Sequence, residues 1–396
     1  MNPRLDALQP YPFEKLRALH AGVVLPSGLR PVNLSIGEPK HPTPAFIEQA
    51  IIANLSGLSG YPPTLGPLSL RTAIAQWLQK RYALPLIDPA TQVLPVLGSR
   101  EALFSFVQTV IDPAHGGVVL SPNPFYQIYE GAALLAGARI EFVNDDPSRG
   151  FACDWDSVPE SIWQDTRLVF TCSPGNPAGH VMSLDEWKTL FDRADKYGFV
   201  IAADECYSEI YLDEAAPPIG ALEAAHKLGR TDFRNLMIFS SLSKRSNVPG
   251  MRSGFVAGDA KLVKKFLLYR TYHGCAMSGV VAAASEAAWL DEAHVVENRR
   301  LYREKFDAVV PILQGKIDVK RPPASFYLWA GVKGDDTAFA RDLLQTEAVT
   351  VLPGSYLARD AWGRNPGAGR IRIALVAPLA DCVEAAERIA RFATTR

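Results

Sequence analysis

The chain has 396 residues, of which 48% are hydrophobic, and its 41 basic and 42 acidic residues give a formal net charge of -1. This length predicts a sizeable core in two domains, or in one large domain with a smaller one beside it. The near-neutral charge excludes a general attraction to nucleic acid or to an anionic membrane, so the expected partners are small molecules or a second copy of the chain.

The cysteines and histidines show no pattern typical of a metal site or a disulfide framework. The five cysteines are widely spaced without a CxxC pair, and the seven histidines lack metal-ligand spacing, so no metal is predicted. The amino terminus lacks the apolar core of a signal peptide, and no run reaches the roughly 18 apolar residues of a membrane span. We therefore expect a cytoplasmic protein that does not span a membrane.

Short apolar runs alternate with helical patterns through the middle of the chain. The runs that predict strands cover residues 118–120, 168–170, 199–203, 236–239 and 254–257. Between two of them, apolar residues from 184 to 197 recur on one helical stripe. This alternation predicts an α/β fold with a mostly parallel central sheet that is covered on both faces.

After about residue 285 the pattern changes to that of a smaller α+β domain. Its predicted elements are a helical pattern that runs toward residue 313, strands at 326–329, 349–352 and 371–375, and helices at 339–347 and 383–392. The amino-terminal residues are too rich in proline and glycine to fold alone. We therefore divide the chain into an amino-terminal segment (1–47) that packs with the small domain, a large domain (48–285) and the small carboxy-terminal domain (286–396).

Polar residues follow the predicted strands at the edge where ligands collect in open parallel sheets. Gly98 and Ser99 stand at a helix entry whose free N–H groups suit a phosphate, although Ser99 alone also fits a plain N-cap. Tyr126 offers a ring on which a flat ligand can stack, or packs in the core. Asn176 lies in a segment that fits a simple turn, and Asp204 also fits a helix cap. Each signal is weak by itself.

The apolar run at 236–239 leads into SSLSK, which delivers Lys244 to the end of a buried strand. A buried ammonium group is costly unless the protein uses it. A flat cofactor with a phosphate, a protonated ring nitrogen and an aldehyde would use all of these groups, and that cofactor is pyridoxal 5′-phosphate. Lys244 would form a Schiff base with it, and nearby cations would lower the pKa of this lysine. Asp204 would pair with the ring nitrogen, while Arg252 and Ser241 would bind the phosphate.

The ordered motifs GSRE, PFY, NPAG, DECY, SLSK and RIRIAL extend over nearly the whole chain, which resembles the fold-type I, class I/II aminotransferases. The resemblance implies a three-layer fold, catalytic roles for Lys244, Asp204 and Tyr207, and a homodimer with shared active sites. It implies cofactor contacts from Tyr61 of a partner subunit and from Gly98, Ser99, Arg100, Tyr126, Asn176, Asp204, Tyr207, Ser241, Ser243, Lys244 and Arg252.

The resemblance also implies individual roles within the site. Tyr126 would stack on the cofactor ring, while Asn176 and Tyr207 would contact its phenolic oxygen. Arg372 would bind the α-carboxylate of the substrate, and Gly37, Asn176 and Lys40 are further candidate substrate contacts. The second substrate implied is 2-oxoglutarate, so glutamate would be the usual amino donor or product.

Three longer stretches, LSIGEPKHPTP, LPVLGSREALF and SPNPFYQIYEGAALLAGA, resemble the succinyldiaminopimelate aminotransferases of bacterial lysine and diaminopimelate biosynthesis. Lys40 and Arg100 are basic departures from the broader family pattern, and nearby cations would suit a succinyl carboxylate. The alternative is that both residues are solvated or form structural ion pairs.

Other functions use much the same residues. A kynurenine-, aspartate- or alanine-type aminotransferase, or a carbon–sulfur β-lyase, would need the same lysine, aspartate and arginine set, and the fold does not separate these activities. A cofactor-sensing domain of a transcription regulator is disfavoured because the chain shows no basic DNA-binding extension. A paired-carboxylate mechanism is also disfavoured, because Asp204 and Glu205 are adjacent on a strand and should face opposite sides.

Overall fold

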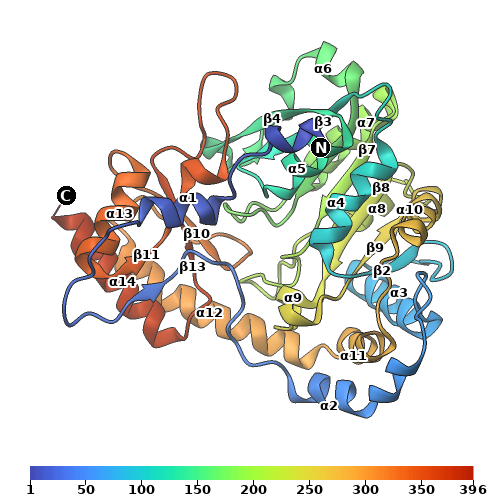
Figure 1. Ribbon diagram of the computed structural model, residues 1–396, viewed down its shortest axis with the longest axis horizontal. Coiled ribbons are helices and arrows are strands. Elements are labelled where there is room, and N and C mark those ends of the chain that lie inside the picture. The colour runs from blue at the N-terminus through green and yellow to red at the C-terminus, as the bar shows by residue number, and fades with distance from the viewer. Residues whose placement is uncertain (396) are drawn as a thin grey trace.

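An eight-stranded sheet is the largest element of the computed structural model, which describes residues 1–395 (Figure 1). In spatial order its strands are β2 (Val93–Val96), β9 (Gly254–Gly258), β8 (Leu236–Ser241), β7 (Val200–Asp204), β6 (Thr166–Cys172), β3 (Val118–Asn123), β4 (Arg139–Asp146) and β5 (Ala152–Cys153). The strands from β8 to β4 are parallel, whereas β9 is antiparallel to both of its neighbours and β5 is antiparallel to β4. The predicted mostly parallel sheet is confirmed.

Side chains of this sheet alternate between two hydrophobic cores, because successive residues of a strand point to opposite faces. On β7, Ile201 and Ala203 belong to one core, and Val200 and Ala202 belong to the other. The first core is covered by α2 (Ala45–Ala53), α3 (Leu68–Tyr82), α6 (Glu160–Asp165), α7 (Leu184–Tyr197), α8 (Ala221–Lys227) and α11 (Gly279–Leu290). The second is covered by α4 (Ser99–Val110), α5 (Ile128–Ala136) and α10 (Ala260–His273). The sheet therefore forms the middle of three layers.

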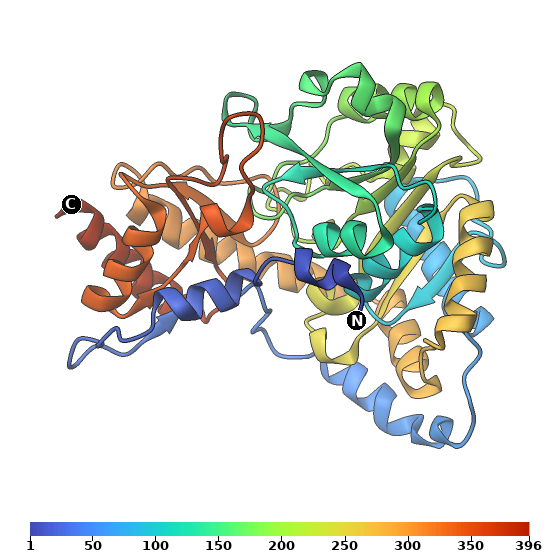
Figure 2. The same ribbon diagram turned by 45° about the horizontal axis from the view of Figure 1, so that its top comes forward.

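A smaller α+β unit lies to one side of the large sheet (Figure 2). Its three antiparallel strands are β10 (Tyr327–Gly331), β13 (Arg370–Ala374) and β12 (Leu352–Pro353). Its helices are α12 (Ala293–Leu313), α13 (Asp336–Glu347) and α14 (Leu379–Thr394). A two-stranded parallel sheet of β1 (Val32–Asn33) and β11 (Val349–Thr350) extends the unit. These elements enclose a separate hydrophobic core.

The amino-terminal segment contacts both units, and Figure 2 shows it running between them. Its first turn, η1 (Pro3–Ala7), lies against α5, whereas α1 (Pro12–Leu19) contacts the short turn η6 (Gly354–Leu357) of the small unit. The remaining short 3-10 turns are η2 (Leu55–Ser59), η3 (Pro147–Arg149), η4 (Trp155–Ser157) and η5 (Pro249–Met251). Because residue 285 lies inside α11, we propose that the division between the large and small domains falls between α11 and α12.

Three strands of the large sheet were not predicted from the sequence: β2, β4 and β5. The sequence of β2 reads VLPV, and a proline normally argues against a strand. Pro95 is tolerated because β2 lies at the edge of the sheet and pairs only with β9. The short β5 lies at the opposite edge, where two residues suffice to extend β4.

The cysteines of the described chain carry free thiols, and Cys382 is the buried one among them. Among residues 1–395, no three histidine, cysteine or carboxylate side chains are grouped so as to hold a metal ion. Within the same residues, none of the helices combines the length and the apolar character that crossing a membrane requires.

Candidate active site

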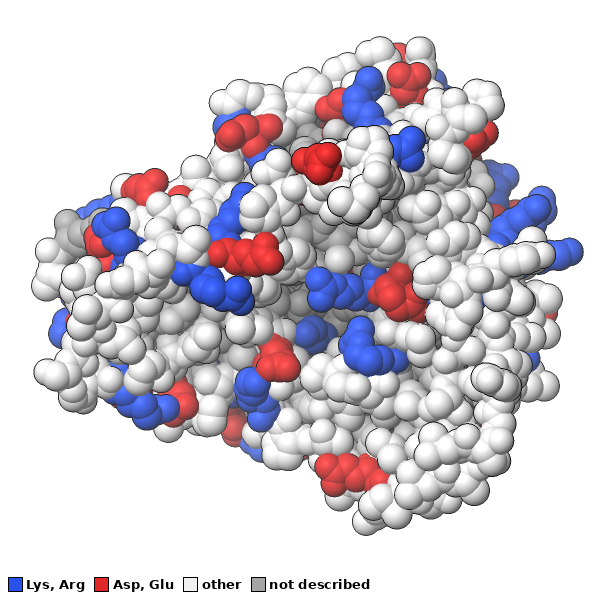
Figure 3. Space-filling model, viewed as in Figure 1, with Lys and Arg blue, Asp and Glu red and all other residues white. Residues whose placement is uncertain are grey.

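A cavity of about 410 Å³ opens where the parallel strands end and the small unit faces the sheet. Figure 3 shows a hollow in the middle of this face with basic side chains gathered around it. A volume of this size suits a small-molecule ligand. The predicted site residues that line it are Gly37, Ser99, Arg100, Tyr126, Asn176, Asp204, Tyr207, Ser241, Ser243, Lys244, Arg252 and Arg372. The structure thus brings together residues that lie far apart in the sequence.

Three predicted site residues do not line the cavity. Gly98 lies just behind its wall, immediately before α4. Lys40 is exposed and pairs with Glu38, which agrees with the alternative that it forms an ion pair at the surface. Tyr61 is fully exposed. The role predicted for Tyr61 depends on a second subunit, so it stays a prediction.

Lys244 lies on α9 (Leu242–Arg245), a single turn that follows β8 directly. Its Nζ donates a hydrogen bond of 2.6 Å to the carbonyl oxygen of Gly37, which also lines the cavity. Burial lowers the pKa of Lys244 to about 8, and the positive charges of Arg372 and Arg252 act in the same direction. The sequence predicted a lowered pKa from neighbouring cations, whereas the structure makes burial the larger cause.

Asp204 is the last residue of β7 and is buried. Its carboxylate accepts hydrogen bonds from the Tyr129 hydroxyl at 2.7 Å and from the Cys206 amide at 3.2 Å. Burial raises the pKa of Asp204, although these hydrogen bonds oppose the effect. A protonated ring nitrogen beside this carboxylate would favour its ionised form. The arrangement therefore fits the predicted partner of a pyridinium group.

Glu205 points away from the cavity, as the strand alternation predicts. Its two carboxylate oxygens accept hydrogen bonds from the Tyr82 hydroxyl at 2.8 Å and from the Ala221 amide at 2.6 Å. Burial raises the pKa of Glu205 to about 7. Adjacent acids thus occupy opposite sides of the strand end, and the cavity receives only the first.

Tyr207, Asn176 and Arg372 line one wall of the cavity together. The Arg372 guanidinium donates to Asn176 Oδ1 at 3.0 Å and to the Ser35 carbonyl at 2.8 Å. It also lies 4.3 Å from the centre of the Tyr327 ring. The hydroxyls of Tyr207 and Tyr327 are 3.0 Å apart, and burial raises the pKa of Tyr207, which keeps this phenol neutral. Arg372 is therefore fixed before any ligand binds.

Hydrogen-bond donors gather in a corner of the cavity at the entrance to α4. Gly98 has a φ of 86°, and a Cβ atom added there would lie 2.4 Å from Arg252 Nη2. Glycine thus permits both the left-handed backbone and the close approach of the guanidinium to the helix terminus. Ser99 and Ser241 lie beside this corner in the lining of the cavity. Free N–H groups, hydroxyls and a guanidinium together fit the phosphate of the predicted cofactor.

Several residues of the site were not predicted from the sequence. Tyr129 and Tyr327 contact predicted residues from other elements, and Cys206 donates its thiol hydrogen to the Ser99 hydroxyl at 2.8 Å. Tyr11, from the amino-terminal segment, lines the cavity, and the Arg100 guanidinium lies 5.3 Å from the centre of its ring. Cys206 could have been predicted from the sequence, because it lies in the DECY motif between two predicted site residues. No local sequence pattern marks the others.

The lowered pKa of Lys244 predicts how fast the cofactor-free protein captures pyridoxal 5′-phosphate. Only the neutral amine attacks an aldehyde, so the capture rate should rise with pH and level off above pH 8. Stopped-flow absorbance between pH 6 and pH 11 measures this profile. A simple alkylamine serves as the reference, because its rate should keep rising to about pH 10.4, the pKa of an ordinary lysine. A protein profile that follows the reference would contradict the prediction.

Comparisons with known proteins agree with this geometry. The family model for class I and II aminotransferases matches residues 30–389. The LL-diaminopimelate aminotransferase of Nitratidesulfovibrio vulgaris (strain DP4) is 32% identical over 395 residues, which cover 98% of each chain.

Two crystal structures are also similar. An aminotransferase from Neisseria meningitidis Z2491 is 58% identical, with a TM-score of 0.95 over 98% of this chain and 99% of that one. The aminotransferase AspB from Helicobacter pylori 26695 is 36% identical, with a TM-score of 0.91 over 98% of this chain and 100% of that one. The chain therefore belongs to the class I and II aminotransferases, whose cofactor is pyridoxal 5′-phosphate.

Proposed function

We propose that this aminotransferase exchanges the amino group of N-succinyl-LL-2,6-diaminopimelate with 2-oxoglutarate. The observation that carries this proposal is the charge of the cavity. Among the described residues that line it, Asp204 is the only carboxylate, whereas Arg100, Lys244, Arg252 and Arg372 are basic. Asp204 lies at the end of β7 and would be paired with the cofactor. The rest of the cavity is therefore suited to a substrate with several negative charges and no distal ammonium group.

Different residues of the chain would bind the cofactor and transfer the proton. Ser99, Ser241 and Arg252 would hold the phosphate, while Asp204 would hold the ring nitrogen. When bound, the cofactor supplies an electron sink that makes the α-proton of an amino acid acidic. Lys244 would move that proton, since a pKa of about 8 leaves part of its amine unprotonated near neutral pH.

Arg372 would orient the reacting end of the substrate. Its guanidinium can bind both oxygens of an α-carboxylate, and its contacts to Asn176 and Ser35 already hold it in place. Tyr207, kept neutral by burial, would donate a hydrogen bond toward the cofactor. Fixing the carboxylate and the cofactor in this way would place Cα within reach of the Lys244 amine.

The distal end of the substrate would contact Arg100. This guanidinium lines the cavity and lies over the Tyr11 ring, whereas Lys40 is exposed and pairs with Glu38. Acylation by a succinyl group removes the distal ammonium charge and adds a carboxylate. Arg100 would attract that carboxylate and would disfavour a free ammonium group.

A second candidate substrate is LL-2,6-diaminopimelate without the succinyl group. It is favoured by the 32% identity to the LL-diaminopimelate aminotransferase of N. vulgaris over 98% of both chains. This substrate would bring an ammonium group as well as a carboxylate to the distal end. The kcat/KM ratio for the two compounds, measured with 2-oxoglutarate as acceptor, separates the candidates. Including aspartate, alanine, kynurenine and a β-substituted cysteine tests the other aminotransferase types and the β-lyase reaction.

Replacement of Arg100 by methionine is expected to lower kcat/KM for N-succinyl-LL-2,6-diaminopimelate by about 10- to 150-fold, the value of one charge-assisted hydrogen bond of roughly 1.5–3 kcal/mol. The value for alanine should change little, because alanine has no distal carboxylate. Steady-state kinetics with both donors measures the difference. Lys40→Met is the matched comparison, and a selective loss in that variant but not in Arg100→Met would assign the distal contact to Lys40.

We also propose that the enzyme is a homodimer with shared active sites. Tyr61 and the neighbouring Leu55 and Leu58 are exposed, although they are large and largely apolar. Such a surface suits contact with a second copy of the chain. Tyr61 would then reach the corner at the entrance to α4 of the partner subunit, where the phosphate would bind, as the resemblance of the sequence to the family implies.

A further inference from the structure

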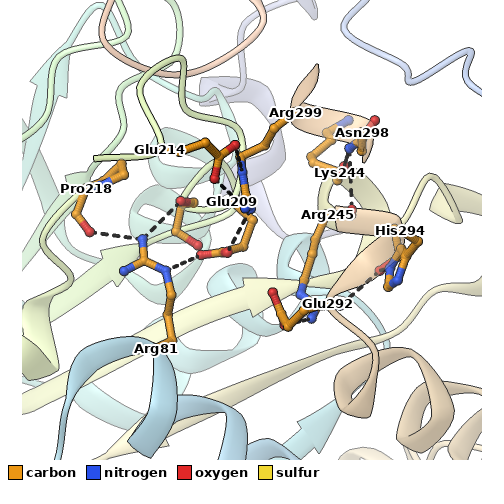
Figure 4. Close-up of polar contacts among 12 residues, drawn as sticks. Arg81, Glu209, Glu214, Pro218, Lys244, Arg245, Glu292, His294, Asn298 and Arg299 are labelled. Atoms are coloured by element: carbon orange, nitrogen blue, oxygen red, sulfur yellow. Dashed lines mark hydrogen bonds and ion pairs between the residues drawn. The ribbon is translucent and has the colours of Figure 1, made fainter. Parts of the chain in front are cut away.

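Asn298 on α12 contacts the main chain of the segment that carries Lys244. Its Nδ2 donates to the carbonyl oxygens of Lys244 at 3.2 Å and of Arg245 at 3.4 Å (Figure 4). Its Oδ1 accepts hydrogen bonds from His41 Nδ1 at 2.8 Å and from Asn247 Nδ2 at 3.1 Å. Asn298 is 2% exposed, so it makes these four contacts away from solvent. A buried amide that is satisfied at both ends has one fixed orientation.

Lys305, two turns farther along α12, determines which way these hydrogen bonds run. Its Nζ lies 2.7 Å from His41 Nε2 and donates to the Val376 carbonyl at 3.3 Å. Lys305 is buried, and the hydrogen-bond partners of its Nζ among residues 1–395 are His41 and the Val376 carbonyl. An ammonium group only donates, so His41 Nε2 must accept and Nδ1 must carry the hydrogen. The chain of donors therefore runs from Lys305 through His41 and Asn298 to the Lys244 carbonyl.

The same network approaches Lys244 from a second direction. His41 follows Gly37 by four residues, and the Gly37 carbonyl accepts a hydrogen bond from Lys244 Nζ. Asn298 thus contacts the main chain of Lys244, and His41 holds the segment whose Gly37 carbonyl accepts a hydrogen bond from the Lys244 amine. Hydrogen bonds in a buried series strengthen one another.

Other contacts from α12 hold the neighbouring residues but do not touch Lys244. Arg245 pairs with Glu292, the residue immediately before α12 (Figure 4), and His294 Nε2 lies 2.8 Å from the Ser246 hydroxyl. Within the part of the chain that the structure describes, Asn298 is the residue of α12 with a hydrogen bond to Lys244.

We propose that Asn298 is a positioning residue for Lys244, and that Lys305 and His41 hold it in the orientation in which its amide donates to the Lys244 carbonyl. The network fixes the base of the lysine side chain relative to the Gly37 segment, and so determines where the amine lies in the cavity. This inference rests on the role of Lys244 in the proposed function.

Asn298→Asp tests the inference, since a carboxylate keeps the two acceptor contacts but cannot donate to the Lys244 carbonyl. The pH midpoint of the absorbance of the bound cofactor should shift relative to that of the wild-type holoenzyme. The kcat should fall about 10-fold or more, because small displacements of a reacting group are costly, while KM for 2-oxoglutarate changes less than threefold. Tyr302→Phe is the matched control on α12. It removes a buried hydroxyl that has no hydrogen-bond partner among residues 1–395, and it keeps the ring, whose centre is 4.5 Å from that of His41.

An unchanged absorbance midpoint in a folded Asn298→Asp protein would overturn the inference, even if thermal unfolding showed lower stability. If that variant does not fold, Lys305→Met provides the test, because it keeps an unbranched side chain that is only one atom shorter and removes the first donor. In Lys305→Met, a shift in the pH midpoint of the cofactor absorbance relative to the wild-type holoenzyme supports the inference, even if it is smaller than the shift expected for Asn298→Asp. An unchanged midpoint overturns the inference. Borohydride reduction of the wild-type holoenzyme, followed by peptide mass spectrometry, reports separately on the role of Lys244. A label on another lysine would overturn that role and this inference with it, whereas a label on Lys244 with no shift in the variants would overturn the inference alone.

Discussion

Replacement of Lys244 by alanine is expected to abolish turnover, because the variant would lack the amine that we propose attaches the cofactor and moves the α-proton. General acid–base catalysis alone contributes about 10²- to 10⁴-fold, so the combined loss should exceed this range. Steady-state assays with alanine as amino donor and 2-oxoglutarate as acceptor measure the loss of kcat. Borohydride reduction should label the wild-type chain at Lys244 and leave the variant unlabelled.

Lys305 provides a stringent control for this assignment. Burial lowers its pKa to about 8, as it does that of Lys244, so both lysines combine low basicity with burial. Lys305 contacts His41 and a carbonyl group, however, and does not line the cavity. A borohydride label on Lys305, or label retained in the Lys244→Ala variant, would contradict the assignment of Lys244.

Replacement of Arg372 by alanine is expected to lower kcat/KM for every amino acid and keto acid substrate. All of them carry the carboxylate that Arg372 would bind, and loss of one partner of a desolvated charge pair costs roughly 2–5 kcal/mol. The expected decrease is therefore about 30- to several-thousand-fold. Measurements with glutamate, alanine and 2-oxoglutarate should show similar losses, in contrast to the selective effect of Arg100→Met.

Arg372→Lys tests the geometry of the contact rather than its charge. Lysine keeps the positive charge but cannot bind both carboxylate oxygens while contacting Asn176 and Ser35 as the planar guanidinium does. We expect it to recover only part of the activity lost in Arg372→Ala. Unchanged substrate affinity in the alanine variant would exclude Arg372 from carboxylate binding.

The sequence predicted the middle of the large sheet because its parallel strands are buried on both faces. The strands β7 and β8 begin as apolar runs, and polar residues with proposed roles in the reaction, Asp204 and Lys244, lie at or just after their ends. Two parallel strands that end at one edge bring such residues together. A local pattern was therefore enough to predict this part of the cavity.

The rest of the site depends on contacts that no local pattern contains. Tyr129 is 75 residues from Asp204 in the chain, and Tyr327 is 120 residues from Tyr207. Each looks like an ordinary aromatic residue of a helix or strand until the fold brings the pairs together. Lys40 stays a predicted substrate contact, and in the structure its exposed side chain pairs locally with Glu38.

Asp204 and Glu205 face opposite sides at the end of β7, so the carboxylate that the cavity receives depends on the register of this strand. Asp204 faces the cavity and Glu205 faces Tyr82, and β7 is held by neighbouring strands that oppose Cys172 and Phe239 to Asp204. A slip of one position against both neighbours would put Glu205 in the place of Asp204 and move Asp204 to the place of Ala203, which lies in a hydrophobic core. A variant with that slip would keep its backbone hydrogen bonds and lose the carboxylate that we propose pairs with the ring nitrogen, so the sheet register would itself determine reactivity.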